Sequence, residues 1–571
     1  MENNNIQTRV GLKPRQIPHY NRLYNLYFRS AFAFDTSVMR AGKTYTTSEL
    51  ILAFKFQYVI VFAPISAHAS WEKVKRLFGI NIILLTTYQS LASKKGYQPS
   101  HGLLVRDDSD PTKPVFIATE LYLRYVQAGI FVVFDEVSFI SNKSTTWWQA
   151  TKALIDPILA SRGPSRFILI SGTPIRKKDE VVSFLQLVGI IRERLLYNYH
   201  KLSKYLELRG AREVENYARA IDNNEVNMIL EKTPWKGPNP TKYGEHITDV
   251  IYQLYIRVVS KYINSAMPGP ENEVPLDIKT GYYLMLPEDL LSYRQAIGAL
   301  QSAARWNPAT GEVDMKNANL GGITKALVRI EASKLHTFVR LALQVLTSNP
   351  KAKVVLSFNY NASIRLAIEN LKQFNPLMLN GSIPSNKRGP IIEAFQRHNS
   401  GYRLLITNMQ VVGFGVDLHD AFGDEPRYAF GSSSYYVRTI HQWTHRFYSE
   451  GTKSTPTVRM VQGNINEGNV LDPSMIETSI YNSIIKSSTV FSDYLLEQVE
   501  AGEKFPGQYD IEIEASARLQ IPYIRLNEEQ ISGVYAQDMR DEEETVVQEL
   551  GNLNLVTVQP KVPLTIHPTS K

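Results

Sequence analysis

A short string directly ahead of a helical pattern is the first part of the chain that could do chemistry. The string is Arg40-Ala41-Gly42-Lys43-Thr44, and it follows an apolar run at residues 31–34. A tight loop before a helix points backbone N–H groups at phosphate oxygens, while a lysine reaches the terminal phosphates and a threonine hydroxyl binds magnesium. The string is therefore predicted to hold a nucleoside triphosphate. The first glycine of the usual GxxxxGKS/T pattern falls on Ser37, so an ordinary helix start stays open as the alternative.

Two adjacent carboxylates end a second apolar run. Asp135 and Glu136 follow residues 130–134, about 90 residues after Lys43. In a nucleotide hydrolase the first carboxylate holds magnesium and the second polarises the attacking water. A solvated acidic turn would look the same in isolation, but the two motifs together favour ATP hydrolysis. The string Ser171-Gly172-Thr173-Pro174 also follows an apolar run, although taken alone it is better interpreted as a turn.

These motifs need strands and helices to position them, and the hydrophobic pattern contains two series of both. Short β-branched and aromatic runs alternate with stretches of helical spacing, which is typical of a parallel sheet covered on both faces. The first series has expected strands at 58–62, 82–85, 115–117, 130–134 and 167–170, with expected helices at 44–54 and 147–158. The second has expected strands at 354–358, 377–379 and 404–407, with expected helices at 334–346, 364–374 and 388–395. The expected fold class is α/β, with two RecA-like parallel-sheet lobes in tandem and a mainly helical insert between them.

The composition excludes several other classes of protein. With 43% hydrophobic residues among 571, the chain can bury large cores, and its length predicts three to four domains at about 150 residues each. The absence of cysteine excludes disulfide scaffolds, Cys-ligated zinc and thiol catalysis, and the 11 histidines lack the spacing of a zinc site. A net charge of +8 is compatible with a nucleic-acid partner without identifying one. The polar N-terminus and the lack of long apolar stretches predict a soluble, intracellular protein without a membrane partner.

The order of the motifs resembles that of superfamily 2 helicases and translocases. The amino-acid strings of the individual motifs are similar to those of the Swi/Snf-type DNA-dependent ATPases. The strings that carry the resemblance in the first half are Leu12–Gln16, Val61–Pro64 with Trp71, Leu85–Tyr88 and Asp135–Lys143. Those in the second half are Ser333–Leu335, Val354–Phe358, Leu379–Ser382 with Arg388 and Phe395, Ile406–Asn408, Gly413–Leu418 and His441–Arg446. Together with the hydrophobic pattern, the resemblance divides the chain into an N-terminal ATP-binding lobe at 1–190, an insert and linker at 191–320, a C-terminal lobe at 321–500 and a partly disordered extension at 501–571.

The resemblance also implies roles for single residues. Catalysis would depend on Lys43, Asp135, Glu136 and Arg446, and Mg²⁺ would be held by Thr44 and Asp135. ATP would be bound by Arg40 to Thr44 and by Gln16, which would read the adenine, together with Gly415, Asp417 and Gln442. The nucleic-acid backbone would be contacted by Ser66, Thr86, Tyr88, Ser382 and Asn408.

Two further positions depart from the family pattern. Ser138, in the string that begins at Asp135, stands where the family usually has histidine. The string His441–Arg446 resembles the family's motif VI, and Ser449, three residues after Arg446, stands where that motif usually has its second arginine. An arginine supplied across a lobe interface can change the rate of hydrolysis by several orders of magnitude. Three alternatives stay open: Arg446 serves alone, Lys453 or Arg438 substitutes for the missing arginine, or hydrolysis is weak.

The sequence therefore predicts an ATP-dependent helicase or translocase that uses ATP and Mg²⁺ and moves along nucleic acid. Duplex DNA is favoured over RNA as the track, because the motif strings resemble those of the Swi/Snf-type DNA-dependent ATPases. A degenerate ATPase acting as a nucleic-acid-binding structural subunit, motivated by Ser37, Ser138 and Ser449, and an RNA helicase stay open as alternatives. The acidic run at 541–544 and the tail after it form a candidate docking segment for replication or transcription proteins. The lack of cysteine and the divergent motifs suggest a viral protein, acting in the cytoplasm or nucleus of a host or packaged in a virion.

Overall fold

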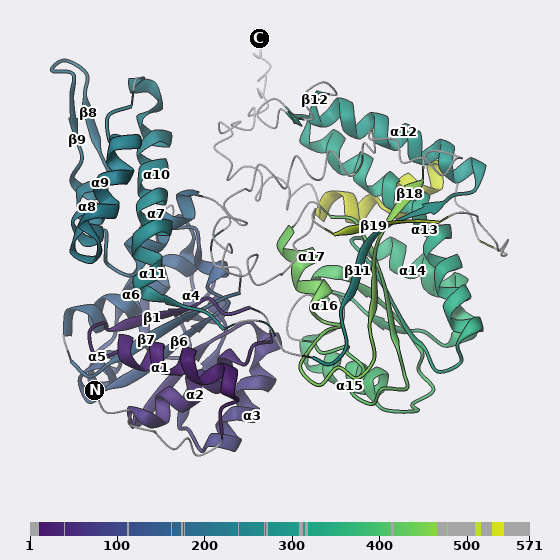
Figure 1. The fold of residues 1–571 in the computed structure, drawn as a ribbon, viewed down its shortest axis with the longest axis horizontal. Coiled ribbons are helices and arrows are strands. Elements are labelled where there is room, and N and C mark those ends of the chain that lie inside the picture. Colours follow the sequence, from purple (N-terminus) through teal and green to yellow (C-terminus); the bar gives the residue numbers. More distant parts are fainter. Residues whose placement is uncertain are drawn as a thin grey trace, which may run out of the picture.

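The computed structural model describes residues 11–541 of the 571-residue chain with several gaps. The gaps are 39, 111–113, 162, 173–174, 176–177, 238, 268, 270–271, 308–311, 314–317, 413–415, 435–436, 465–476, 478–508, 515–522 and 524–527. The described residues form two α/β lobes, each built around one parallel sheet (Figure 1). The predicted α/β fold class is confirmed.

The first lobe contains a six-stranded parallel sheet in the order β10-β1-β7-β6-β2-β3. These strands are β10 (Asn264–Ser265), β1 (Phe32–Asp35), β7 (Arg166–Ile170), β6 (Ile130–Asp135), β2 (Tyr58–Phe62) and β3 (Ile82–Thr86). Strand β6 lies in the interior of the sheet, and all six of its residues are buried. A strand buried on both faces has no polar alternation, which explains the continuous apolar run that the sequence shows there.

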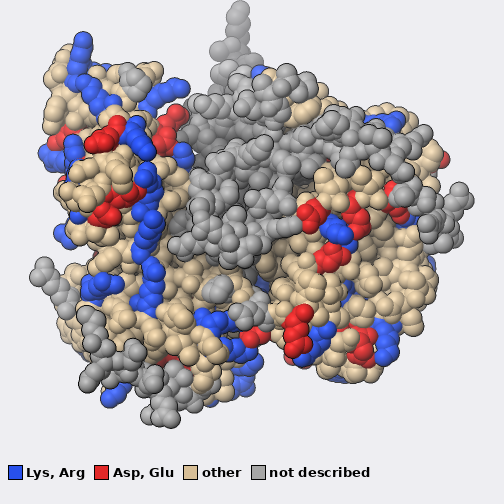
Figure 2. Space-filling view, viewed as in Figure 1, with Lys and Arg blue, Asp and Glu red and all other residues tan. Residues whose placement is uncertain are grey.

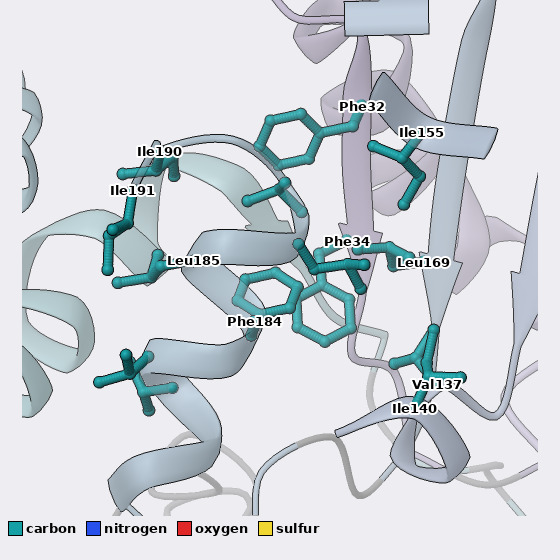
Figure 3. Close-up of a cluster of buried hydrophobic side chains, with 14 of the residues drawn as sticks. Phe32, Phe34, Val137, Ile140, Ile155, Leu169, Phe184, Leu185, Ile190 and Ile191 are labelled. Carbon is teal, nitrogen blue, oxygen red and sulfur yellow. The ribbon is translucent and has the colours of Figure 1, made fainter. Parts of the chain in front are cut away.

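Alternate residues of β6 enter two different hydrophobic cores. Phe131 and Val133 pack in the core formed with helices α1 (Ile17–Leu26), α2 (Lys43–Ala53) and α3 (His68–Phe78). Phe134 and its alternate neighbours pack in the core formed with α6 (Thr146–Ser161) and α7 (Lys178–Leu187). Figure 3 shows part of this second core, where Phe34 of β1 stacks on Phe184 of α7 with ring centroids 4.7 Å apart. The sheet is therefore fixed from both sides.

The second lobe contains a seven-stranded parallel sheet in the order β15-β16-β14-β17-β18-β11-β19. These strands are β15 (Leu377–Leu379), β16 (Leu404–Asn408), β14 (Lys353–Phe358), β17 (Arg427–Ser432), β18 (Thr457–Asn464), β11 (Asp277–Leu284) and β19 (Asp510–Ile513). One core packs the sheet against α13 (Leu320–Ser348) and α14 (Asn361–Asn370), and another packs it against α15 (Ser385–Gln396), α16 (Met409–Val412) and α17 (Val437–Thr444).

The remaining elements extend the two lobes. The first lobe also has α4 (Tyr88–Ala92), α5 (Glu120–Ala128) and the hairpin β8 (Asn198–His200) and β9 (Tyr205–Glu207). Helices α8 (Arg209–Ile221), α9 (Asn223–Lys232) and α10 (Tyr243–Leu254) project from it with that hairpin, and α11 (Ser260–Ile263) leads back (Figure 1). In the second lobe α12 (Pro287–Ala304) packs along α13, near the short hairpin β12 (Trp306–Asn307) and β13 (Glu312–Val313) and helix α21 (Glu528–Val534).

Sheet membership differs from the sequence expectation at four strands. β5 (Val115–Ala118) pairs antiparallel with β4 (Leu104–Asp107) and not with the parallel sheet, because its side chains alternate between exposed and buried. β10 and β11 come from the expected linker, yet they join the first and second sheets respectively, and β19 comes from the expected C-terminal extension. Strands as short as β10 carry no recognisable period in the sequence. The domain boundaries at 190, 320 and 500 stay a prediction.

Among the described residues, the structure contains no helix with the length and apolar character needed to cross a membrane.

Phe134 gives a test of the sheet that positions the site. Its buried ring stacks on Phe62 with centroids 5.5 Å apart, so Phe134→Ala would leave a cavity next to the acidic turn. We expect the substitution to lower the free energy of unfolding of the first lobe by about 3–5 kcal/mol in chemical denaturation. Phe28→Ala, at a ring that is 67% exposed, is the matched control and should cost less than about 1 kcal/mol. Similar losses for the two variants would contradict the assignment of Phe134 to the core.

Candidate functional site

Three of the predicted motifs meet at one edge of the first sheet. The loop that ends in Lys43 follows β1, Ser171 follows β7, and Asp135 is the last residue of β6. Because β1, β7 and β6 are neighbouring parallel strands, their carboxyl ends lie side by side. This edge of an open α/β sheet is the usual place for a ligand.

The loop before α2 is shaped to receive an anion. Gly42 precedes the helix with φ of 100°, a left-handed conformation that favours glycine. A Cβ at this position would lie 2.0 Å from Gln16 Nε2, so a side chain is also excluded by contact. No acidic residue lies in the first turn of α2, and its N-terminal N–H groups carry partial positive charge. The residues present therefore fit a phosphate group.

Lys43 and Ser37 hold this loop in its conformation. The Lys43 ammonium donates hydrogen bonds to the backbone oxygens of Ser37 and Val38, both at 3.0 Å. The Ser37 hydroxyl accepts a hydrogen bond from the backbone N–H of Met267 at 2.8 Å and donates one to Asp35. The serine that replaces the usual glycine thus ties the loop to the segment that leaves the first sheet.

Gln16 packs directly on the loop. Its amide nitrogen donates to the Ala41 backbone oxygen at 3.0 Å, and its amide oxygen accepts from the Lys13 backbone N–H at 3.0 Å. Gln16 therefore connects the Leu12–Gln16 string, called here the entry motif, to the phosphate loop, and its predicted reading of adenine stays a prediction.

The acidic turn is held by two side chains from other segments of the first lobe, Trp71 and Tyr88. The Trp71 indole donates to Asp135 Oδ2 at 2.9 Å, and the Tyr88 hydroxyl donates to the Asp135 backbone oxygen at 2.9 Å. Burial, followed by the charge of Glu136, raises the pKa of Asp135 to about 6, while Trp71 and Lys43 oppose the rise. Glu136 has a φ of 55° and accepts a hydrogen bond from the Ser171 hydroxyl at 3.3 Å.

The second lobe brings Arg446 and Gln442 to the same region. Burial, followed by the nearby charge of Arg40, lowers the pKa of Arg446 to about 9, while Asp417 and Glu136 oppose the fall. Arg446 therefore lies within electrostatic reach of first-lobe residues on both the phosphate loop and the acidic turn. Gln442 is also buried, and both polar atoms of its amide lack a hydrogen-bond partner among the described residues. A bound polar ligand would satisfy them.

One ion pair joins the two lobes at this point. Arg40 Nη1 lies 2.7 Å from Asp417 Oδ1, and Arg40 Nη2 donates to the Val416 backbone oxygen. The Ser449 hydroxyl donates to the same Asp417 oxygen at 2.9 Å. Burial alone would raise the pKa of Asp417, but Arg40, followed by His419 and Ser449, lowers it below its ordinary value. The phosphate loop is thereby linked to Asp417 and, through it, to Ser449.

A second contact between the lobes involves the entry motif. Lys13 and Arg15 both pair with Glu450, Arg15 at 3.0 Å. Glu450 directly follows Ser449, and the Ser449 backbone oxygen accepts from the Asn272 amide at 2.9 Å. No local pattern indicates this cluster, because Lys13 and Arg15 lie more than 400 residues from Glu450 in the chain.

The predicted nucleic-acid residues have different environments. Ser66 and Thr86 are half-buried at the carboxyl ends of neighbouring strands β2 and β3. Ser382 is exposed after β15 and donates to Asn380 at 2.7 Å, whereas Asn408, at the end of β16, donates to the Asn359 backbone oxygen at 2.8 Å. These four residues occupy sheet edges where a backbone could be contacted.

Tyr88 differs from the prediction that it contacts nucleic acid. It is only 2% exposed, and its hydroxyl is directed at Asp135. It supports the acidic turn from inside the lobe, because the aromatic ring packs in the core below β2 and β6.

The Ser138 hydroxyl is buried and has no hydrogen-bond partner within the described ranges.

Thr44 is half-buried in the first turn of α2, so its hydroxyl and the Asp135 carboxylate offer the oxygen ligands that Mg²⁺ prefers. Lys453 is exposed. Gly415, Thr173 and Pro174 lie outside the described residues, as does the side chain of Arg438.

Comparisons with known proteins find similarity at low sequence identity. No family model matches the sequence. A protein of Acanthamoeba polyphaga mimivirus, whose provisional name is ATP-dependent RNA helicase, is 20% identical over 433 residues, which cover 74% of this chain and 73% of the relative. Two solved structures of the SWI2/SNF2 ATPase core of Sulfolobus solfataricus, one in complex with dsDNA, are 15% and 17% identical. They align over 86% and 81% of this chain and 97% and 87% of theirs, with TM-scores of 0.29 and 0.28.

The raised pKa of Asp135 predicts how its substitution changes stability with pH. The folded chain holds a proton on this carboxyl up to about pH 6, whereas the unfolded chain releases it near 3.8, so stability falls as pH rises between these values. Without nucleotide or metal, Asp135→Asn should raise the free energy of unfolding by about 1–3 kcal/mol above pH 6 and change it little below about pH 4. Denaturant titrations at pH 4 and 7.5 in a chelator measure the difference. An effect independent of pH would contradict the raised pKa.

Proposed function

We propose that this chain is an ATP-dependent nucleic-acid helicase or translocase, in which ATP is hydrolysed between the two lobes and drives movement along DNA. One observation carries the proposal: Arg40 of the phosphate loop in the first lobe pairs with Asp417 of the second at 2.7 Å, and the backbone oxygen of the buried Arg446 accepts a hydrogen bond from the N–H of Leu418, the residue after Asp417, at 2.8 Å. A nucleotide bound by the phosphate loop would thus be flanked by both lobes. The mimivirus relative, with its provisional name, supports an ATP-dependent helicase.

Each residue has a physical role in this proposal. The Lys43 ammonium would exchange the backbone oxygens of Ser37 and Val38 for phosphate oxygens. Thr44 and Asp135 would hold Mg²⁺, which neutralises phosphate charge when bound. With a pKa of about 6, Asp135 is largely ionised at neutral pH and able to bind a cation.

The carboxylate and the guanidinium on either side would act on the reaction itself. Glu136, oriented by Ser171, would position the attacking water. Arg446 would stabilise the negative charge that develops on the γ-phosphate, and burial strengthens that interaction. The Gln442 amide would donate to and accept from the nucleotide.

Several features support a nucleic-acid track. Figure 2 shows Lys and Arg side chains along the projecting helices of the first lobe and on the lobe below them, as a phosphate backbone would require. Thr86 and Asn408 end strands β3 and β16, and Ser66 and Ser382 lie shortly after strands β2 and β15. Contacts of this kind read the backbone and not the base sequence. An RNA track is the second candidate, because the mimivirus relative is named for RNA.

The hydrolysis proposal predicts separate effects of two substitutions. Lys43→Ala should abolish ATP turnover, because it removes the charge that neutralises the terminal phosphates. Glu136→Gln should retain ATP binding and lose turnover, because binding and water activation use different groups. Phosphate release and titration with a fluorescent ATP analogue measure the two properties. Equal turnover in the wild type and Glu136→Gln would show that hydrolysis occurs elsewhere.

The track proposal predicts which polymer stimulates the ATPase. Duplex DNA should stimulate it more than single-stranded DNA or RNA at fixed low salt, and the stimulation should fall steeply as salt rises, because the contacts are to phosphates. Turnover measured with each polymer across a salt series tests this. RNA stimulating several-fold better than duplex DNA would replace the DNA track by an RNA track, and no stimulation by any polymer would favour the degenerate structural subunit.

A further inference from the structure

The position of the missing motif VI arginine is filled by a small, buried group with a defined partner. Ser449 is buried, and its hydroxyl donates to Asp417 Oδ1 at 2.9 Å. Its backbone is also fixed, since the Ser449 N–H donates to the Thr452 hydroxyl at 3.0 Å and its oxygen accepts from Asn272. The structure therefore encloses serine here, and the position is not open to solvent.

A guanidinium from the opposite lobe reaches the same carboxylate oxygen. Arg40 Nη1 lies 2.7 Å from Asp417 Oδ1, so the arginine and the Ser449 hydroxyl share one acceptor atom. Arg40 Nη2 also donates to the Val416 backbone oxygen, which sets the plane of the guanidinium. The side chain that motif VI lacks thus has a chemical equivalent directly across Asp417.

The backbone at Arg40 shows that this placement is built into the loop. Arg40 has a φ of 65°, the left-handed region that costs a non-glycine residue about 1–2 kcal/mol. Such a conformation persists where surrounding contacts over-determine it, and it occurs often at functional sites. The residue lies three positions before Lys43, so its side chain starts at the loop proposed to bind phosphate and extends to Asp417 of the second lobe.

The charge balance explains why position 449 does not carry an arginine as well. Arg40 and Arg446 are close enough for the charge of Arg40 to disfavour protonation of Arg446. Asp417 is the carboxylate that offsets both. A third guanidinium at 449 would compete with Arg40 for the same oxygen and add positive charge to a buried region, which is costly without a new partner.

We infer that Arg40 supplies, from the phosphate loop, the cationic charge that position 449 of motif VI lacks, and that Asp417 and Ser449 position it. This inference rests on the proposed ATP hydrolysis. The arginine has moved from one side of the lobe interface to the other, and the second lobe now controls it through Asp417. Its guanidinium acts on charge that develops at the γ-phosphate, so its benefit is concentrated in the transition state.

A double-substitution experiment tests the relocation. Arg40→Ala should lower kcat at least about tenfold, with ATP affinity changed less than about threefold, and Arg40→Lys should fall between it and the wild type. Ser449→Arg alone should not raise kcat. Arg40→Ala combined with Ser449→Arg should recover several-fold of the loss, because the guanidinium returns to Asp417 from the other lobe.

A binding measurement separates charge stabilisation from a structural role. Arg40→Ala should bind ADP with Mg²⁺ as the wild type does, but bind ADP with Mg²⁺ and aluminium fluoride, which resembles the transition state, at least about tenfold more weakly. Arg124→Ala, an exposed arginine on α5, is the matched control and should leave both affinities and kcat unchanged.

The outcomes distinguish this inference from the proposed function. If Lys43→Ala abolishes turnover while Arg40→Ala matches the wild type, hydrolysis stands and the relocation is wrong. If Arg40→Ala is slow but Ser449→Arg restores nothing, Arg40 only joins the lobes, and the relocation is again wrong. If Lys43→Ala and the wild type release phosphate equally, the proposed function itself fails and the inference falls with it.

Discussion

An ion pair that crosses the contact between the two lobes is the interaction on which the site depends. The first lobe contributes Arg40 and Glu136, and the second contributes Arg446 and Asp417. A buried charge without a partner costs several kcal/mol, whereas a paired and hydrogen-bonded one is tolerated. The direct pair, Arg40 with Asp417, crosses the lobe contact. A change in charge on one lobe, such as a bound triphosphate, would therefore change how strongly the other is held.

The two sheets and the segment between them meet this constraint. Residues 266–276 join β10 of the first sheet to β11 of the second, and the same stretch contacts both sides of the site. The Met267 N–H donates to Ser37 in the phosphate loop, while the Asn272 amide donates to the Ser449 backbone oxygen and accepts from the Gly451 N–H. Met267 and Asn272 of this segment therefore contact the two sides of the site, one in each lobe.

The acidic turn shows how the core supports a charged edge. Trp71 and Tyr88 are almost fully buried, yet each directs a polar atom at Asp135. Aromatic side chains with one polar atom suit this position, because they fill the core and satisfy a buried acceptor. The resulting carboxylate is held rigidly, which a metal ligand or a water-positioning group requires.

The sequence by itself determined the α/β class, four strands of the first sheet, three strands of the second, and the motifs at strand ends, because buried parallel strands and tight loops leave local patterns. Residues 58–62 and 377–379 are strands as predicted, and α2 begins at Lys43. Only the tertiary structure decided that β10, β11 and β19 join the sheets, because strand pairing depends on hydrogen bonds between segments distant in sequence. The meeting of Arg40 with Ser449 at Asp417 is of the same kind, since the phosphate loop and motif VI lie about 400 residues apart and come together only when both lobes fold and pack.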